Sequence, residues 1–164
     1  SINFAAEMQN KIKSLTLIST TYKRSDKQRQ EVIDRVNLAK LNKPISKLAL
    51  KRWFTDNYLE NNKDTYNKFI KILTKKPNDQ KNFIKAYELF ANYKDDINII
   101  KKINTRTLVM TGSHDPGSTP EMSKNLSNDL TNSLYCEINN GKHLCSIECA
   151  DDVNIKIKEF LENV

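Results

Sequence analysis

Two short apolar runs near the end of the chain each lead through a tight turn to a titratable side chain. Residues 107–111 (TLVMT) are followed by Gly112 and then by Asp115, and residues 134–138 (LYCEI) are followed by Asn-Asn-Gly-Lys and His143. Runs of this length and composition, bounded by glycine and asparagine, are typical of buried strands. In open parallel sheets, ligands and catalytic groups collect at the carboxyl ends of the strands. The sequence therefore predicts an acid and a histidine at one edge of a sheet.

The rest of the chain predicts an α/β fold with about three parallel strands, flanking helices and an inserted helical segment. Residues 12–19 form a further β-rich run, whereas residues 22–102 show helical periodicity, best in residues 63–74. After Asp115, Thr119 can cap a helix that begins at Pro120. Strands that alternate with helices imply right-handed crossovers and a parallel sheet. We assign residues 1–21 and 103–164 to the sheet-bearing core and residues 22–102 to a helical lid.

The order of Asp115 and His143 suggests catalytic chemistry. In a serine hydrolase triad, the acid accepts the ring N–H of the histidine, which then acts as base toward a serine. Taken singly, Asp115 could be a turn or capping residue before Pro116, and His143 a surface turn residue. Together they are more consistent with an acid and a base. None of the three glycines lies in a Gly-x-Ser-x-Gly turn, so we expect the nucleophile to lie outside this chain, which begins without Met and is expected to be a fragment.

Three segments resemble motifs of the α/β-hydrolase superfamily. Residues 103–115 (INTRTLVMTGSHD) are similar to its "I-x-x-P-T-L-V-x-x-G-x-x-D" pattern, with Arg106 in place of the usual proline. Residues 141–148 (GKHLCSIE) resemble its "G-x-H-x-x-x-x-E" turn, and residues 11–19 resemble the strand that follows the nucleophile helix. The resemblance implies a partial α/β-hydrolase fold, Asp115 and His143 as catalytic acid and base, no cofactor and no metal.

The resemblance also suggests a substrate class. Residues 52–55 (RWFT) are similar to a feature of the 3-oxoadipate enol-lactonase-like subgroup, which implies a small carboxylic ester or lactone as substrate. Similar esterases of biotin synthesis act on an ester that is carried on an acyl-carrier protein. Four aromatic residues of the helical segment are candidates for an acyl pocket, although aromatics at helical spacing are more often plain core: Trp53, Phe54, Phe69 and Tyr87.

Other side chains near the two turns are weaker candidates. His114 adjoins Asp115 and could pair with it, but a residue beside the acid in such a turn more often points elsewhere. Glu148 could support the histidine as an outer carboxylate or lie at a helix N-terminus. Cys145 and Cys149 near His143 do not form a metal-binding pattern, and Ser1 is not favoured as an N-terminal nucleophile.

Charge and composition bear on partners and location. Residues 23–102 carry 20 of the 27 Lys and Arg residues but only 10 of the 20 Asp and Glu residues. This basic excess could attract an acidic carrier protein, or it could simply form a solvated helix face. An alternative function is a non-catalytic module that binds an acidic protein or nucleic acid, although the aromatics lie at core spacing and do not form a stacking platform.

The absence of a long apolar run argues against a membrane partner, and three cysteines without a framework favour the cytoplasm. The run at residues 12–19 would expose a strand edge, which the missing amino-terminal half or a second copy could pair with.

Overall fold

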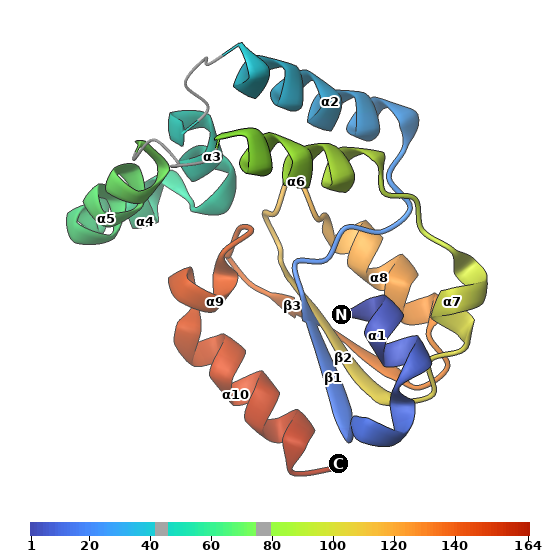
Figure 1. The fold of residues 1–164 in the computed structure, drawn as a ribbon. Coiled ribbons are helices and arrows are strands. Elements are labelled where there is room, and N and C mark those ends of the chain that lie inside the picture. Colours follow the sequence, from blue (N-terminus) through green and yellow to red (C-terminus); the bar gives the residue numbers. More distant parts are fainter. Residues whose placement is uncertain (42–45, 75–79) are drawn as a thin grey trace. The chain divides into compact units, whose positions relative to one another are not determined.

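The computed structural model describes residues 1–41, 46–74 and 80–164 (Figure 1). These residues form two compact units: a sheet unit of residues 1–23 and 95–164, and a helical unit of residues 24–94. The sheet unit contains α1 (Ile2–Glu7), a 3₁₀ turn (Gln9–Lys11), β1 (Ser14–Ile18), α7 (Ile97–Lys101), β2 (Arg106–Gly112), α8 (Pro120–Asp129), β3 (Ser133–Ile138), α9 (Cys145–Glu148) and α10 (Ala150–Leu161). The helical unit contains α2 (Asp26–Lys40), α3 (Ser46–Trp53), α4 (Asp56–Asn61), α5 (Lys63–Thr74) and α6 (Gln80–Asn92).

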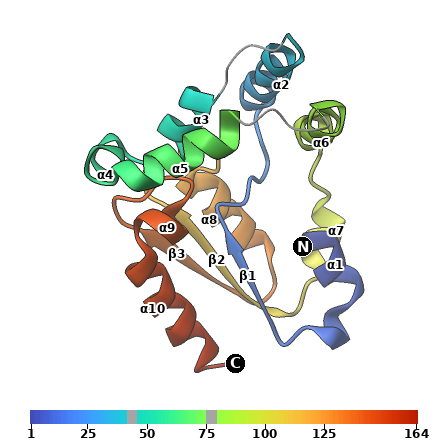
Figure 2. The ribbon, with the colours of Figure 1, turned by 60° about the vertical axis from the view of Figure 1, so that its left-hand side comes forward.

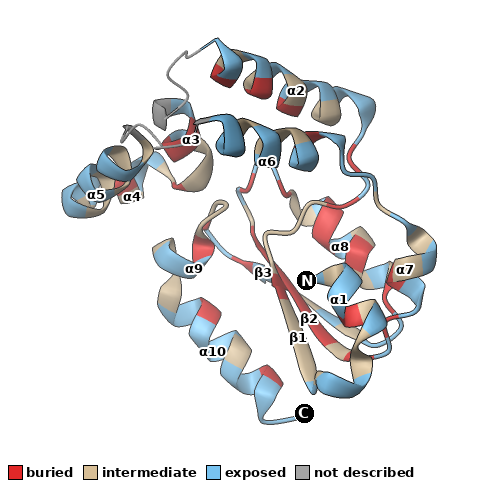
Figure 3. Ribbon diagram, viewed as in Figure 1, coloured by how far each residue is buried: buried red, intermediate tan, exposed pale blue. Residues whose placement is uncertain are grey.

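The predicted parallel sheet is confirmed. Its strand order is β1-β2-β3, and both pairings are parallel. The register places Val109 of β2 opposite Leu17 on one side and Tyr135 on the other. β2 is the central strand and is buried along almost its whole length (Figure 3), which explains why its sequence is a continuous apolar run and not an alternating one.

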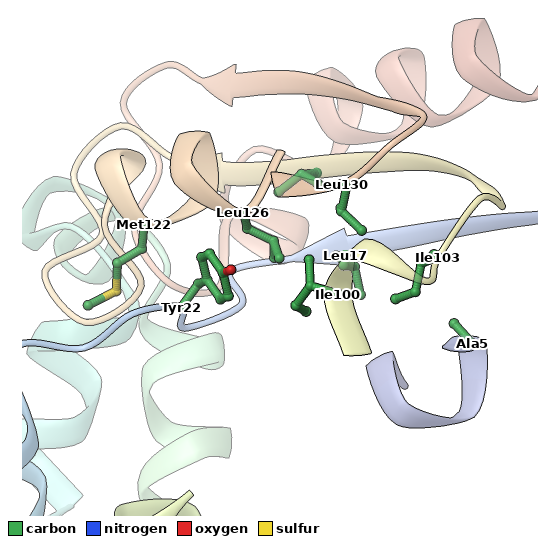
Figure 4. Packing of buried hydrophobic residues seen from close by; sticks show 9 residues of the cluster. Ala5, Leu17, Tyr22, Ile100, Ile103, Met122, Leu126 and Leu130 are labelled. Atoms are coloured by element: carbon green, nitrogen blue, oxygen red, sulfur yellow. The ribbon is translucent and has the colours of Figure 1, made fainter. Parts of the chain in front are cut away.

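Two apolar clusters cover the two faces of the sheet. Successive residues of a strand point to opposite faces, so Val109 joins one cluster and its neighbours Leu108 and Met110 join the other. The first cluster includes residues from α1, β1, α7 and α8, which meet as Figure 4 shows. The second is built with α9 and α10, and α10 runs along its own face of the sheet in Figures 1 and 2.

The helix after β2 begins as the sequence predicts. Thr119 caps α8 by accepting a hydrogen bond from the backbone N–H of Met122 at 3.3 Å, and Pro120 occupies the first helical position. Met122, Leu126 and Leu130 are buried in the first cluster. Burying each such side chain contributes about 1.5–3 kcal/mol, so α8 is held firmly against the sheet.

The borders between the two units differ from those that the sequence suggested. We expected the helical segment to span residues 22–102, whereas the helical unit spans residues 24–94. Tyr22 is 1% exposed and packs in the first cluster of the sheet unit, and so does Ile100 of α7. Periodicity marks α7 as a helix but does not show which core its apolar side joins.

The helical unit has its own packing. Val32 and Val36 of α2 pack against Ala91 of α6. Ser25 begins α2 with a capping box, in which its hydroxyl accepts from the N–H of Gln28.

None of the helices in the described part of the chain combines the length and apolar character that a membrane crossing requires.

Candidate active site

Asp115 lies in the turn directly after β2. Its backbone N–H donates to Gly112 O at 3.0 Å, which closes the turn at the carboxyl end of the central strand. The side chain is fully buried. Its Oδ1 accepts hydrogen bonds from the backbone N–H groups of Gly117 at 2.8 Å and Ser118 at 2.9 Å. These two donors fix the carboxylate and compensate for its burial, and they leave Oδ2 directed at another partner.

That partner is His143. The ring Nδ1 of His143 lies 2.9 Å from Asp115 Oδ2. Because a carboxylate can only accept, Nδ1 carries the proton in this contact, and Nε2 of the neutral ring is the basic nitrogen. The His143 side chain is 36% exposed, whereas that of Asp115 is 0% exposed. The pair therefore has a buried acid that orients an accessible imidazole.

Backbone contacts join the two turns that carry these residues. His114 N–H donates to Gly141 O at 2.9 Å, and Asn140 N–H donates to the Ser113 hydroxyl at 3.0 Å. A Cβ atom on Gly112 would lie 2.3 Å from Gly141 O, so the turns approach too closely for any side chain at that position. Asn140 has a φ of 58°, a left-handed conformation that asparagine tolerates better than most residues. These features hold the Asp115 turn and the His143 turn at a fixed separation.

The weaker candidates near the turns lie in different positions. His114 is exposed and contributes its backbone N–H to the turn contacts. The Glu148 carboxylate accepts from the backbone N–H of Lys142 at 3.1 Å, directly beside His143. Burial raises the pKa of the Cys145 thiol, and burial together with Glu148 raises the pKa of Cys149 to about 11. Across residues 1–41, 46–74 and 80–164, no three His, Cys, Asp or Glu side chains are grouped so that they could hold a metal ion.

The structure groups three of the four aromatic candidates. The ring of Phe69 lies 5.3 Å from that of Phe54 and 6.1 Å from that of Trp53, both in edge-to-face geometry. Phe54 is fully buried, as expected of a core residue. Tyr87 lies in the other cluster of the helical unit, and its hydroxyl accepts from Arg35 Nε at 3.3 Å. A pocket role for these residues stays a prediction.

Sequence reasoning missed the residues that hold the acid. The backbone donors of Gly117 and Ser118 form a side-chain-to-backbone turn with Asp115. The signal was present as Asp115-Pro-Gly-Ser, because aspartate followed by proline and glycine favours such turns. No sequence pattern predicts the hydrogen bond from Asn140 N–H to the Ser113 hydroxyl, because it joins two turns that are distant in sequence.

The sheet, its crossovers and the buried acid paired with a histidine define part of an α/β-hydrolase fold. Solved structures confirm this class. The chain is similar to the enol-lactonase from Burkholderia xenovorans, with a TM-score of 0.86, 22% identity and coverage of 98% of this chain and 60% of the other. It is also similar to a thermophilic esterase from Thermogutta terrifontis, with a TM-score of 0.81, 19% identity and coverage of 99% and 60%.

The chain belongs to the Ndr family, whose model matches residues 2–163. Among curated proteins it is similar to (E)-2-((N-methylformamido)methylene)succinate hydrolase from Acinetobacter baylyi, at 26% identity over 155 residues. That match covers 92% of this chain and 56% of the relative. The chain is therefore related to enzymes of the α/β-hydrolase fold, and it spans little more than half the length of the relatives it matches.

Proposed function

We propose that the chain supplies the acid and the base of a serine hydrolase that cleaves a carboxylic ester or lactone. The observation that carries this proposal is the contact of 2.9 Å between His143 Nδ1 and Asp115 Oδ2 at the carboxyl edge of the sheet. The buried carboxylate orients the ring and stabilises the imidazolium that forms when Nε2 takes a proton. His143 acts first as general base toward a serine hydroxyl and then as general acid toward the leaving group.

The serine nucleophile and the oxyanion hole are supplied, in this proposal, by a segment outside the 164 residues. No Gly-x-Ser-x-Gly pattern occurs in the sequence. Within the described residues, β1 pairs with β2 on one side and its other edge has no strand beside it. Unpaired backbone N–H and C=O groups along such an edge favour the addition of a strand. We propose this edge as the docking position of the segment that carries the nucleophile, with a second copy of the chain as the competing occupant.

Turnover of p-nitrophenyl acetate tests the assignment of the base. The assay uses a protein in which these residues are joined to a segment that carries the nucleophile serine. We expect His143→Ala to lower kcat/KM by about 10⁴-fold or more, because loss of a triad member removes the proton transfer and disables the nucleophile. His114→Ala is the matched control, since it removes an exposed imidazole next to Asp115, and it should change turnover by less than about twofold. Undiminished turnover in His143→Ala would defeat the proposal.

Within this class, the substrate is either a small ester or lactone or an ester attached to an acidic carrier protein. Two similar proteins, an enol-lactonase and a substituted succinate hydrolase, support small substrates. The basic excess of residues 23–102 supports a carrier protein. Ionic strength distinguishes them: kcat/KM for a carrier-bound ester should fall steeply between low and physiological salt, whereas that for a small neutral ester should stay nearly constant.

A further inference from the structure

Glu148 holds both neighbours of His143. Its carboxylate Oε2 accepts from the backbone N–H of Lys142 at 3.1 Å, and its own backbone N–H donates to Leu144 O at 3.0 Å. Lys142 precedes the histidine and Leu144 follows it. A single residue therefore fixes the chain on either side of the imidazole-bearing residue.

The side-chain bond is the part of this arrangement that the local backbone cannot supply. α9 has only four residues and is joined to α10 through Cys149, so its own backbone bonds order the chain after His143 but not the chain before it. Four backbone bonds close the turn after His143: Cys145 N–H donates to Lys142 O at 3.1 Å, Ile147 and Glu148 N–H donate to Leu144 O at 2.8 and 3.0 Å, and Cys149 N–H donates to Cys145 O at 2.8 Å. The backbone N–H of Lys142, which precedes His143, donates to the half-buried Glu148 carboxylate in a charge-assisted bond.

The position of this bond bears directly on the ring. Asp115 is held by backbone donors of its own turn, so its Oδ2 is a fixed target. A hydrogen bond to that target requires His143 to be placed within a few tenths of an ångström. The two residues before His143 are each held by a hydrogen bond. Gly141 O accepts from His114 N–H of the Asp115 turn, and Lys142 N–H donates to the Glu148 side chain of α9.

We propose that Glu148 is a positioning residue that keeps His143 Nδ1 on Asp115. This inference rests on the proposed function, in which that contact prepares the base. Glu148 acts through the backbone of Lys142 and not through the imidazole. The hydrogen-bond acceptor at residue 148 is what matters, so an uncharged acceptor at this position should also keep the contact.

Three variants of the 164-residue chain test the proposal without any substrate. Glu148→Ala removes the acceptor, Glu148→Gln keeps an acceptor oxygen without the charge, and Ser146→Ala changes an exposed residue of the same helix as a control. The readouts are hydrogen exchange at the Lys142 amide and the ¹⁵N chemical shifts of the neutral His143 ring, which report its tautomer. The chain contains two histidines, so a His114→Gln background assigns the signals.

We expect the Lys142 amide of Glu148→Ala to exchange about tenfold faster or more, because a hydrogen bond to a charged group is lost. The His143 ring in that variant should change from a single Nδ1–H tautomer to a mixture. Glu148→Gln and Ser146→Ala should both keep the single tautomer. An unchanged tautomer in Glu148→Ala would overturn the proposal, and so would a Glu148→Gln variant that behaves like Glu148→Ala. Either result is independent of whether the complete protein hydrolyses esters.

Discussion

The three glycines of the chain provide a graded test of the site geometry. An added Cβ at Gly112 would lie 2.3 Å from Gly141 O and 2.5 Å from both Gly141 C and Lys142 O. At Gly141 it would lie 2.8 Å from Cys145 Cβ and 3.2 Å from Cys149 Sγ, whereas at Gly117 its nearest neighbour is Asp115 Oδ1 at 3.6 Å. We therefore expect Gly112→Ala to be the most destabilising substitution, Gly141→Ala to be intermediate and Gly117→Ala to be nearly neutral.

The magnitude for Gly112→Ala follows from the atoms that the methyl group would meet. The shortest distance falls about 1.1 Å inside the ordinary contact limit of 3.4 Å. All three neighbours are backbone atoms, so no side-chain rotation relieves the overlap, and the His143 turn must move by about 1 Å. Overpacking typically costs about 1–3 kcal/mol. We expect the upper end of this range, about 3 kcal/mol, which corresponds to roughly a 100-fold change in an opening equilibrium.

Native-state hydrogen exchange at the amides of β2 is the suitable assay, because these amides report on the sheet unit. The single tryptophan, Trp53, lies in the helical unit, so its emission is not a direct measure of the stability of the sheet unit. Gly117→Ala serves as the control, with an expected change below about 0.5 kcal/mol. Exchange in Gly112→Ala within about threefold of the wild-type rate would refute the reasoning, and so would equal destabilisation by Gly117→Ala.

Three further predictions concern side chains around the sheet. In Asp115→Asn, the amide oxygen should keep its bonds from the Gly117 and Ser118 N–H groups, and the NH₂ group should face Nδ1 of His143. Because NH₂ is a donor, Nδ1 must then accept, and the ¹⁵N spectrum should show the Nε2–H tautomer. Turnover of the nucleophile-bearing protein should fall about 10⁴-fold. Ser19 has a φ of 50°, so Ser19→Gly should raise the free energy of unfolding by about 1 kcal/mol in urea denaturation. Burial and the hydrogen bond to Asp129 raise the pKa of Tyr22 above its ordinary value of about 10. The folded state therefore holds this proton more tightly, and the stability that it contributes is complete below about pH 10 and is lost at higher pH. In Tyr22→Phe, the free energy of unfolding should be lower by about 1 kcal/mol at neutral pH and should decline less steeply above pH 10 than in the wild type.

Much of the sheet unit could be predicted because the composition and capping residues of each segment agree with its place in the fold. The run in β2 is apolar throughout since the strand is buried on both faces, and Thr119-Pro120 marks the start of α8 by the chemistry of helix capping. The order of Asp115 and His143 along the chain, each after a strand, was sufficient to predict that they lie at the same edge. The α/β fold class and the superfamily resemblance are confirmed by the sheet topology and the comparisons.

The details that complete the site could not be predicted, because they depend on contacts between distant segments. No periodicity indicates that Gly112 must pass against Gly141 or that Ser113 contacts Asn140. The membership of α7 in the sheet unit depends on how its apolar side packs, and a short helix can bury that side in either unit. Likewise, helical spacing did not separate Tyr87 from the cluster of Trp53, Phe54 and Phe69.

The tautomer of the wild-type His143 ring tests the central claim most directly. A two-dimensional ¹⁵N–¹H correlation spectrum of the neutral imidazole distinguishes a protonated Nδ1 from a protonated Nε2. The buried Asp115 carboxylate, with its Oδ2 at 2.9 Å from Nδ1, predicts a single species with the proton on Nδ1 and a basic Nε2. A ring that carries its proton on Nε2, or that averages freely between the two forms, would contradict the claim that this chain holds a histidine ready to act as a base.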